Sequence, residues 1–365
     1  TKIQKFANDF TAYALNHSLE ATATSNKITE ENTTSYTFDN LAAGYYLVYV
    51  TGGKEIQSSL VTVDETTNTV NLKTEAPSIT KAADKETVSI GQVVKYTVTG
   101  SIPDTTGYDQ YQYIIHDELS TGLDFVNDAT GTALGEGATT VNVTVAFTDT
   151  SLVVGGTTPT TATLDTVNNR KMSLDLSTWV KANQENKGKE FTVTYYAKVN
   201  KNAVVIEKNK AQLEYGNKPG ETTTTTPSEA KTPTYPLDIL KIKKDSNVKL
   251  AGAKFSLYTS ETDAKNGTNP IKVTGDNGNY VVDSTSTTTE FVSVENIEGK
   301  DYNLHVNGLA EGTYYLVETK APDGFNKLTA PVKITITKSA DADATKWTIS
   351  KDGDDETDKI IDIAN

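Results

Sequence analysis

The chain has 365 residues, which at about 100–150 residues per domain indicates two to four domains. Its net charge of −14 argues against binding to nucleic acid or to an anionic membrane, because both contacts require basic patches. The absence of cysteine excludes disulfide scaffolds and thiolate metal sites.

The composition favours strands over helices. Tyr is frequent and Thr abundant, whereas the chain has one Met and two Trp. Thr and Tyr suit pleated, half-buried surfaces, so we expect an all-β chain with many short strands. No apolar run is long enough to cross a bilayer, and the chain begins at Thr1 without a signal peptide. We therefore expect a piece of a longer protein, whose export and anchoring signals lie outside it.

The first predicted unit spans residues 1–75. A short amphipathic helix is expected over Lys2–Leu15, where apolar residues recur at helical spacing. Two strands follow within Thr34–Val50, and Leu60–Leu72 alternates again. The unit is too short to be a complete sandwich, so we expect its opening strands to be missing.

The second predicted unit spans residues 76–220 and begins at the Pro77 boundary. Short strand signals separated by turns are typical of an antiparallel sandwich. They lie at Val93–Val98, Tyr111–Ile115, Val141–Phe147, Met172–Leu176 and Phe191–Val199.

Residues 221–236 are rich in Thr and Pro and are predicted to form a semi-rigid, extended linker. The third unit, residues 237–365, is expected to be a second, smaller sandwich. Phe38–Val48 resembles Val306–Val317, so the first and third units are expected to share a fold. Repeated sandwiches joined by linkers suit a stalk or a fibre.

The sequence offers no enzyme signature. It contains neither a Gly-x-Ser-x-Gly elbow nor a phosphate-binding glycine motif. Its three histidines, His17, His116 and His305, lie in different units, which argues against a catalytic triad or a three-histidine metal site. We expect no cofactor, no metal and no catalysis on an external substrate.

Two blocks of the third unit are specific. They read Leu-Ala-Gly-Ala-Lys-Phe-Ser-Leu-Tyr from Leu250 and Tyr-Tyr-Leu-Val-Glu-Thr-Lys-Ala-Pro-Asp-Gly-Phe from Tyr314. With them, the unit closely resembles the CnaB-type domain of Gram-positive pilins and adhesins, an immunoglobulin-like sandwich. In that family a Lys on the first strand bonds to an Asn or Asp on the last, and a Glu promotes the reaction. The resemblance implies Lys243, Asn365 and Glu318, with Lys241 as the alternative lysine.

The second unit has looser motifs around Lys81, His116–Leu123 and Asn209–Pro219. With these it resembles the CnaA-like domain of fimbrial shaft subunits. The resemblance implies that Lys81 bonds to Asn209 and that Asp117 is the catalytic acid. Glu118 is a rival acid, but alternation along the strand places it on the other face.

Burial gives such a site its chemistry. A dry core lowers the pKa of a lysine, so that the amine can attack, and keeps a carboxyl group protonated, so that it can polarise the amide. The fold holds the reactants together at high effective concentration. The alternative for the third unit is a surface Lys–Glu ion pair beside an unrelated terminal Asn.

The resemblance implies a shaft (major) pilin of a Gram-positive surface pilus. Such a subunit lies outside the cell, anchored to the wall. Its partners are other pilin subunits, which a pilus sortase joins covalently, and host surface ligands. The alternative is a non-polymerising, wall-anchored adhesin with CnaB domains as its stalk.

Two further expectations concern the first unit. Lys73 is the candidate acceptor for the sortase, because it ends Val70-Asn71-Leu72-Lys73 before Pro77. The family motif is Val-x-Tyr-Pro-Lys, and this chain lacks the Tyr-Pro, so a solvated interdomain lysine is the alternative. The first unit should have no bond like that of the third, because Tyr49 stands where Glu318 follows the repeated block.

Overall fold

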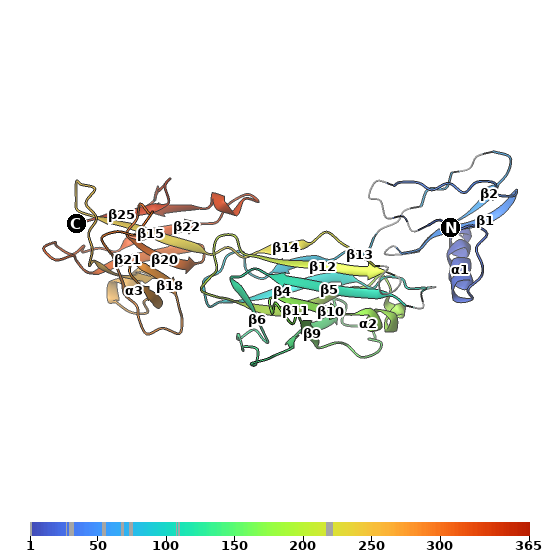
Figure 1. Cartoon of the computed structure of the whole chain (residues 1–365), viewed down its shortest axis with the longest axis horizontal. Coiled ribbons are helices and arrows are strands. Elements are labelled where there is room, and N and C mark those ends of the chain that lie inside the picture. Colours follow the sequence, from blue (N-terminus) through green and yellow to red (C-terminus); the bar gives the residue numbers. More distant parts are fainter. Residues whose placement is uncertain are drawn as a thin grey trace.

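The computed structural model describes residues 2–26, 28, 33–52, 56–66, 69–72, 76–106, 108, 110–216 and 222–365. Three units follow one another along the long axis of the molecule (Figure 1). Strands dominate, and two of the units are β-sandwiches. The predicted fold class, tandem immunoglobulin-like sandwiches preceded by a short helix, is confirmed. No helix among the described residues is both long and apolar enough to cross a membrane.

The first unit is a helix packed on a two-stranded antiparallel sheet. The elements are α1 (Lys2–Asn16), β1 (Gly44–Val50) and β2 (Gln57–Val63). The helix lies where it was predicted, but its packing face consists of small residues, Ala7, Thr11 and Ala14. Small side chains let the helix approach β2 closely. The larger apolar side chains are exposed, and they are Ile3, Phe6, Phe10 and Tyr13.

The predicted repeat has a structural counterpart. The Tyr46 hydroxyl donates to Ala42 O at 2.8 Å, and the Tyr314 hydroxyl donates to Ala310 O at 2.7 Å. Both tyrosines stand two residues after the glycine that begins a strand. The matched positions Asn40 and Gly308 both have positive φ, 59° and 106°. A residue with positive φ and a hydrogen bond from a tyrosine hydroxyl to a backbone carbonyl occur together in both units. The first and third units therefore share this local structure.

The second unit is a two-sheet sandwich (Figure 1). One sheet, in the order β13-β12-β5-β10-β9-β7 with β14 also on β12, contains β5 (Gln112–Leu119), β7 (Thr140–Asn142), β9 (Thr161–Leu164), β10 (Lys171–Asp175), β12 (Lys208–Gly216), β13 (Thr222–Thr224) and β14 (Ser228–Lys231). The other, in the order β3-β4-β11-β6 with β8 on β11, contains β3 (Thr80–Ala83), β4 (Val93–Ser101), β6 (Leu123–Val126), β8 (Thr144–Phe147) and β11 (Glu190–Val199). The helices α2 (Ser177–Ala182) and η1 (Gln184–Asn186) precede β11.

The segment predicted as a linker is part of this sandwich. Strands β13 and β14 both pair antiparallel with β12. Thr suits a sheet edge, and an edge strand needs little apolar content because one side faces solvent. Only residues 232–234 separate β14 from the next strand, and Thr232 and Thr234 are fully buried. The second unit therefore extends beyond residue 220, and no free linker follows it.

The third unit is also a two-sheet sandwich. One sheet, in the order β17-β18-β20-β15-β25, contains β15 (Tyr235–Ile242), β17 (Val273–Asp276), β18 (Asn279–Val282), β20 (Leu304–Leu309) and β25 (Ile360–Ala364). The other, in the order β19-β16-β21-β22-β23-β24, contains β16 (Lys254–Tyr258), β19 (Phe291–Val292), β21 (Gly312–Lys320), β22 (Val332–Thr337), β23 (Thr348–Lys351) and β24 (Asp354–Asp355). The short helices are α3 (Glu261–Asn266) and η2 (Ala344–Lys346). The first strand, β15, runs parallel to the last, β25.

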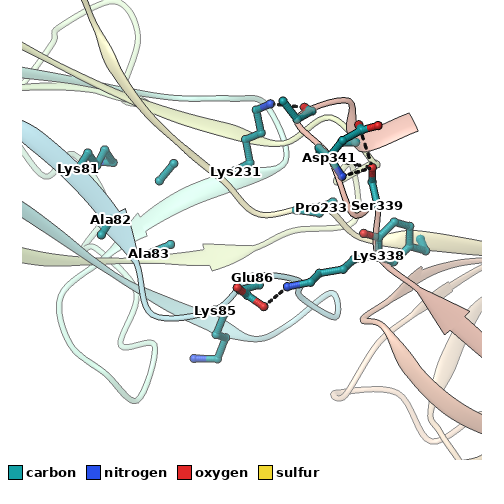
Figure 2. A pocket seen from close by; sticks show the side chains of 14 residues that line it. Lys81, Ala82, Ala83, Lys85, Glu86, Lys231, Pro233, Lys338, Ser339 and Asp341 are labelled. Atoms are coloured by element: carbon teal, nitrogen blue, oxygen red, sulfur yellow. Dashed lines mark hydrogen bonds and ion pairs between the residues drawn. The ribbon is translucent and has the colours of Figure 1, made fainter. Parts of the chain in front are cut away.

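The junction between the second and third units is held by direct contacts. Ile90 N donates to Gly308 O at 3.0 Å, and Ala310 N donates to Ser89 Oγ at 3.2 Å. Lys338 forms an ion pair with Glu86, and both side chains line a cavity of about 310 Å³ (Figure 2). Backbone contacts of this kind fix the orientation of one unit on the other.

Gly308→Ala is expected to loosen this junction. A Cβ atom at residue 308 would lie 2.4 Å from Ile90 Cδ1, so the Ile90 side chain would have to move. We expect a destabilisation of about 1–3 kcal/mol from overpacking. The control is Gly353→Ala, because Gly353 has a φ of 93°, close to the 106° of Gly308, but opens onto free space. Thermal unfolding of both variants checks this, and equal effects would show that backbone strain alone is responsible.

Two candidate sites of lysine, carboxylate and asparagine

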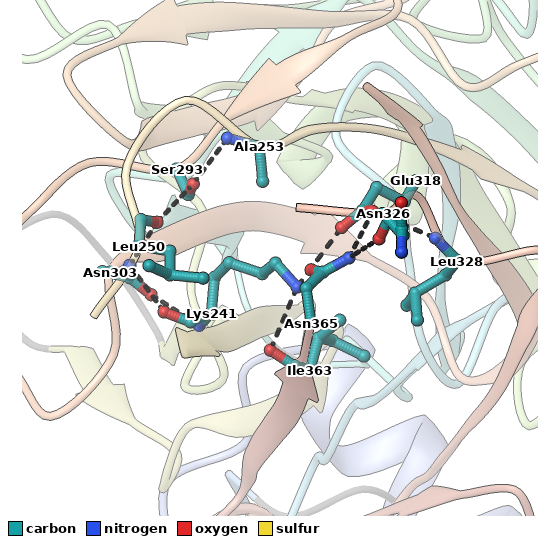
Figure 3. Close-up of polar contacts among 10 residues, drawn as sticks. All are labelled: Lys241, Leu250, Ala253, Ser293, Asn303, Glu318, Asn326, Leu328, Ile363 and Asn365. Atoms are coloured by element: carbon teal, nitrogen blue, oxygen red, sulfur yellow. Dashed lines mark hydrogen bonds and ion pairs between the residues drawn. The ribbon is translucent and has the colours of Figure 1, made fainter. Parts of the chain in front are cut away.

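The first site lies in the core of the third unit. Alternate residues of β15 point inward, so Lys241 occupies a core position and is fully buried. Its Nζ atom lies 3.3 Å from Oε2 of Glu318, which projects from β21 in the opposite sheet (Figure 3). Lys241 Nζ also donates to Ile363 O at 3.3 Å. A lysine and a carboxyl group, both without solvent exposure of their side chains, therefore meet inside the sandwich.

Asn365 completes this site. It follows β25, and parallel pairing places Ile363 of β25 beside Lys241 of β15. Asn365 Nδ2 donates to Glu318 Oε1 at 2.9 Å and to Asn326 O at 2.6 Å, whereas its Oδ1 atom is buried without a hydrogen bond (Figure 3). The predicted acid and the predicted amide are thus in direct contact.

The lysine of this site is Lys241, and the choice of Lys243 is corrected. Strand β15 ends at Ile242, and Lys243 begins a turn in which its side chain is exposed. The two lysines do not share a strand face, because only Lys241 is within the strand. An exposed lysine keeps its charge and cannot act as a nucleophile toward a buried amide.

The surroundings of Lys241 favour its neutral form. Burial lowers the pKa of Lys241, and the nearby Glu318 only partly opposes this. Leu328 N donates to Glu318 Oε1 at 3.1 Å and fixes the carboxyl group. Phe255, opposite Glu318 on β16, is buried. Tyr315 does not line the site, because alternation along β21 turns it to the face opposite that of Glu318.

The second site lies in the core of the second unit. Lys81 of β3 contacts Asp117 of β5, and both side chains have no solvent exposure. Lys81 Nζ also contacts the Tyr195 hydroxyl and lies over the rings of Tyr96 and Tyr195, 4.5 and 4.4 Å from their centroids. Glu118, the rival acid, is exposed on the other face of β5. The expected contact between Lys81 and Asp117 is therefore present in a dry, aromatic environment.

Asn209 lies beside this pair on β12. It is fully buried, and neither atom of its side-chain amide forms a hydrogen bond. Burial raises the pKa values of Asp117 and Tyr195, and the nearby amide of Asn209 acts against this shift. An unpaired buried amide costs about 1–3 kcal/mol, and such exceptions call for a functional explanation. Lys81 comes from one sheet and Asn209 from the other.

Burial opposes the charged forms of both groups in the second site. Burial lowers the pKa of Lys81 to about 8, although Asp117 acts in the opposite direction. Burial raises the pKa of Asp117, and Lys81 opposes that shift. Both shifts act toward an amine beside a protonated acid. In that state Lys81 is a nucleophile and Asp117 is a proton donor toward the amide.

Sequence reasoning missed two residues of these sites. Tyr195 was not recognised, although β11 alternates and places it inward. Asn303, fully buried, accepts from Lys241 N at 2.7 Å and donates to Lys241 O at 3.2 Å. Lys73, the acceptor candidate, lies outside the described residues. Among the residues that are described, no group of three or more His, Cys, Asp or Glu could hold a metal ion.

Comparison with known proteins supports the fold. Residues 236–351 match the family model described as SpaA, prealbumin-like fold domain. No curated protein matches the sequence. The full-length major pilin RrgB from Streptococcus pneumoniae is similar at 16% identity and a TM-score of 0.52, over 84% of this chain and 78% of that chain.

Two further solved structures are similar at the level of the fold. The T6 backbone pilin of serotype M6 Streptococcus pyogenes has 20% identity and a TM-score of 0.51, over 91% of this chain and 69% of that chain. The Corynebacterium diphtheriae major pilin SpaA, described as a modular pilus assembly with stabilising isopeptide bonds, has 19% identity and a TM-score of 0.50, over 90% of this chain and 81% of that chain. The chain therefore has the multi-domain fold of Gram-positive major pilins.

Proposed function

We propose that the protein is the shaft subunit of a covalently polymerised surface pilus, stabilised by two self-formed amide bonds, Lys241–Asn365 and Lys81–Asn209. The observation that carries this proposal is the presence of two groups of Lys, carboxyl and Asn, one in each complete sandwich of a pilin-like fold, in which both lysines and both carboxyl groups are buried. The protein performs one reaction on itself and has no external substrate.

The reaction forms an amide and releases ammonia. The neutral lysine Nζ attacks Cγ of the asparagine, while the carboxyl group donates a proton to the amide oxygen. The amide nitrogen of the intermediate then receives a proton that leaves Nζ and departs as ammonia. The hydroxyl of the intermediate returns its proton to the carboxylate as the carbonyl group forms again. In the third unit the acid is Glu318, which already contacts both Lys241 and Asn365. In the second unit it is Asp117.

The positions of the bonds suit a fibre under tension. Lys241 lies on the first strand of the third unit, and Asn365 follows its last strand. Lys81 lies on the first strand of the second unit, and its bond to Asn209 would join the two sheets. Tension applied at the ends of either unit then passes through a covalent bond. A link that closes about a hundred residues contributes about 5 kcal/mol, and an amide cannot be reduced.

A shaft subunit of this kind is displayed outside the cell and anchored to the wall. Its partners are further copies of the same chain, a pilus sortase that joins them, and host surface ligands. The alternative is a wall-anchored adhesin that does not polymerise. Immunoblots of wall extracts from the producing cells separate the two functions. The shaft function predicts a ladder of covalent multimers that resists boiling in detergent, and a single band would contradict it.

Lys73 is proposed as the lysine that accepts the next subunit. Lys73→Ala in the full-length protein is expected to convert the ladder to monomer, because no other amine would lie at the acceptor position. Lys85→Ala is the control. Lys85 lies on the other side of the Pro77 boundary, and its Nζ atom donates hydrogen bonds to Val93 O and to Asp84. A normal ladder from Lys73→Ala would refute this assignment while leaving the shaft function in place.

A further inference from the structure

Tyr195 connects the two charged partners of the second site. Lys81 Nζ donates to the Tyr195 hydroxyl, and the hydroxyl donates to Asp117 Oδ2. All three side chains are buried. The hydroxyl therefore provides a continuous path for a proton from the lysine nitrogen to the carboxyl group, next to the direct contact of Lys81 with Asp117.

The two oxygens of the Asp117 carboxyl group have different contacts. Asp117 Oδ2 accepts from both Lys81 and Tyr195, whereas Oδ1 is buried without a hydrogen bond. The side-chain amide of Asn209 is also unpaired. Oδ2 thus contacts the nucleophile, Lys81, whereas Oδ1 is available to the amide of Asn209.

We propose that Tyr195 is a catalytic residue of bond formation in the second unit. Its hydroxyl passes protons between Lys81 Nζ and Asp117 Oδ2, and it holds the carboxyl group so that Oδ1 serves Asn209. This inference rests on the proposed amide bond between Lys81 and Asn209.

The proton balance requires transfer of protons from Lys81 Nζ to the carboxyl group, and the Tyr195 hydroxyl offers a path for it beside the direct contact. A charged lysine must lose two protons from Nζ, one before it attacks Asn209 and one after. One proton reaches the departing nitrogen by way of Asp117 and completes ammonia, while the proton lent to the amide oxygen returns to Asp117. The other remains on Asp117 or leaves with ammonia as ammonium. Burial and the charge of Asp117 raise the pKa of Tyr195, so the hydroxyl keeps a proton between transfers.

Tyr96 packs its ring against Lys81 as Tyr195 does, but its hydroxyl does not join the lysine to the carboxyl group. Tyr96 lies directly opposite Tyr195 on the neighbouring strand β4, and its ring is equally close to Lys81 Nζ. Its hydroxyl, however, faces Thr232 Oγ1 at 3.4 Å. In the third unit, backbone groups hold the partners instead, with Leu328 N on Glu318 and Ile363 O on Lys241.

The test compares Tyr195→Phe with Tyr96→Phe, because each substitution removes one hydroxyl and retains its ring. The whole chain is synthesised in a cell-free system, quenched with denaturant at intervals and analysed by intact mass and peptide mapping. General acid–base catalysis contributes about a hundredfold or more to a rate. We therefore expect Tyr195→Phe to slow formation of the Lys81–Asn209 bond about a hundredfold, and Tyr96→Phe to form it at nearly the wild-type rate.

Each outcome has a defined meaning. Equal rates in wild type and Tyr195→Phe, or equal slowing in both variants, would overturn the role of the Tyr195 hydroxyl. Asn209→Ala is the reference for a folded second unit without its bond. A Tyr195→Phe chain that melts well below this reference would show that Tyr195 acts through packing, and would also overturn the proposal. If the wild type itself never forms the bond, the proposed function of the site fails instead.

Discussion

Asp117→Asn is expected to abolish the bond of the second unit and to cause the largest loss of stability. The substituted amide has nearly the same shape but cannot accept and return the lysine proton. The loss of a link that closes more than a hundred residues removes about 5 kcal/mol. Lys81 then lies buried without an opposite charge, which costs about 3–5 kcal/mol more whenever it is protonated. Calorimetry should show a lower transition for the second unit only.

The pH dependence of this variant follows from the pKa of Lys81. Burial lowers that pKa, and Asp117 opposes the shift, so removal of Asp117 lowers it further below about 8. The unfolded chain, with a lysine pKa of about 10.4, then binds more protons than the folded chain. The stability of the variant should therefore rise with pH across the window between these two values.

Glu118→Gln is the matched control for Asp117→Asn. Glu118 is the next residue on β5, but its side chain is exposed on the other face. It should leave the bond, the mass and the transition unchanged. If Glu118→Gln lost the bond and Asp117→Asn retained it, the catalytic acid would be Glu118, and the assignment of Asp117 would be wrong.

Lys241→Met is expected to abolish the bond of the third unit. Methionine fills the same core position without a nucleophile, so the effect on stability comes mainly from the lost cross-link. A loss of about 5 kcal/mol corresponds to a decrease in Tm of roughly 15–20 °C for a unit of this size. The variant should lose one ammonia relative to its sequence mass instead of two.

Lys243→Met is the control for this substitution, because Lys243 lies two residues away and is exposed. It should retain both bonds and melt like the wild type. If Lys243→Met lost the bond of the third unit and Lys241→Met retained it, the assignment of the nucleophile from the structure would be wrong.

The choice between these two lysines shows how far the sequence leads. Alternation along Leu237, Ile239 and Lys241 places all three in the core, and the structure has this pattern. Lys243 was preferred because it begins the family-like Lys243-Lys244-Asp245 that precedes the Leu250 block. This choice was wrong because β15 ends at Ile242, before Lys243. Strand ends depend on tertiary pairing, here with β25 and β20, which the local sequence does not specify.

Other features depend on contacts between distant segments. The Thr-rich residues 222–231 have no apolar periodicity, and they become strands only because β12 offers them an edge. The Tyr195 hydroxyl has its role because β3 and β5 bring Lys81 and Asp117 to it. The positions of the proposed acids Glu318 and Asp117, each beside a buried lysine, could be predicted because family-like blocks surround both.

The intact mass of the folded wild-type chain, followed by peptide mapping, tests the central proposal most directly. Each bond expels one ammonia, so the protein should weigh two ammonia molecules less than its sequence. The mapped cross-links should be Lys241–Asn365 and Lys81–Asn209. None is expected in the first unit, because matching Tyr46 to Tyr314 corrects the predicted alignment and places Val50, which also has no carboxyl group, at the position of Glu318. A fully folded sample whose mass equals that of its sequence would contradict the proposal.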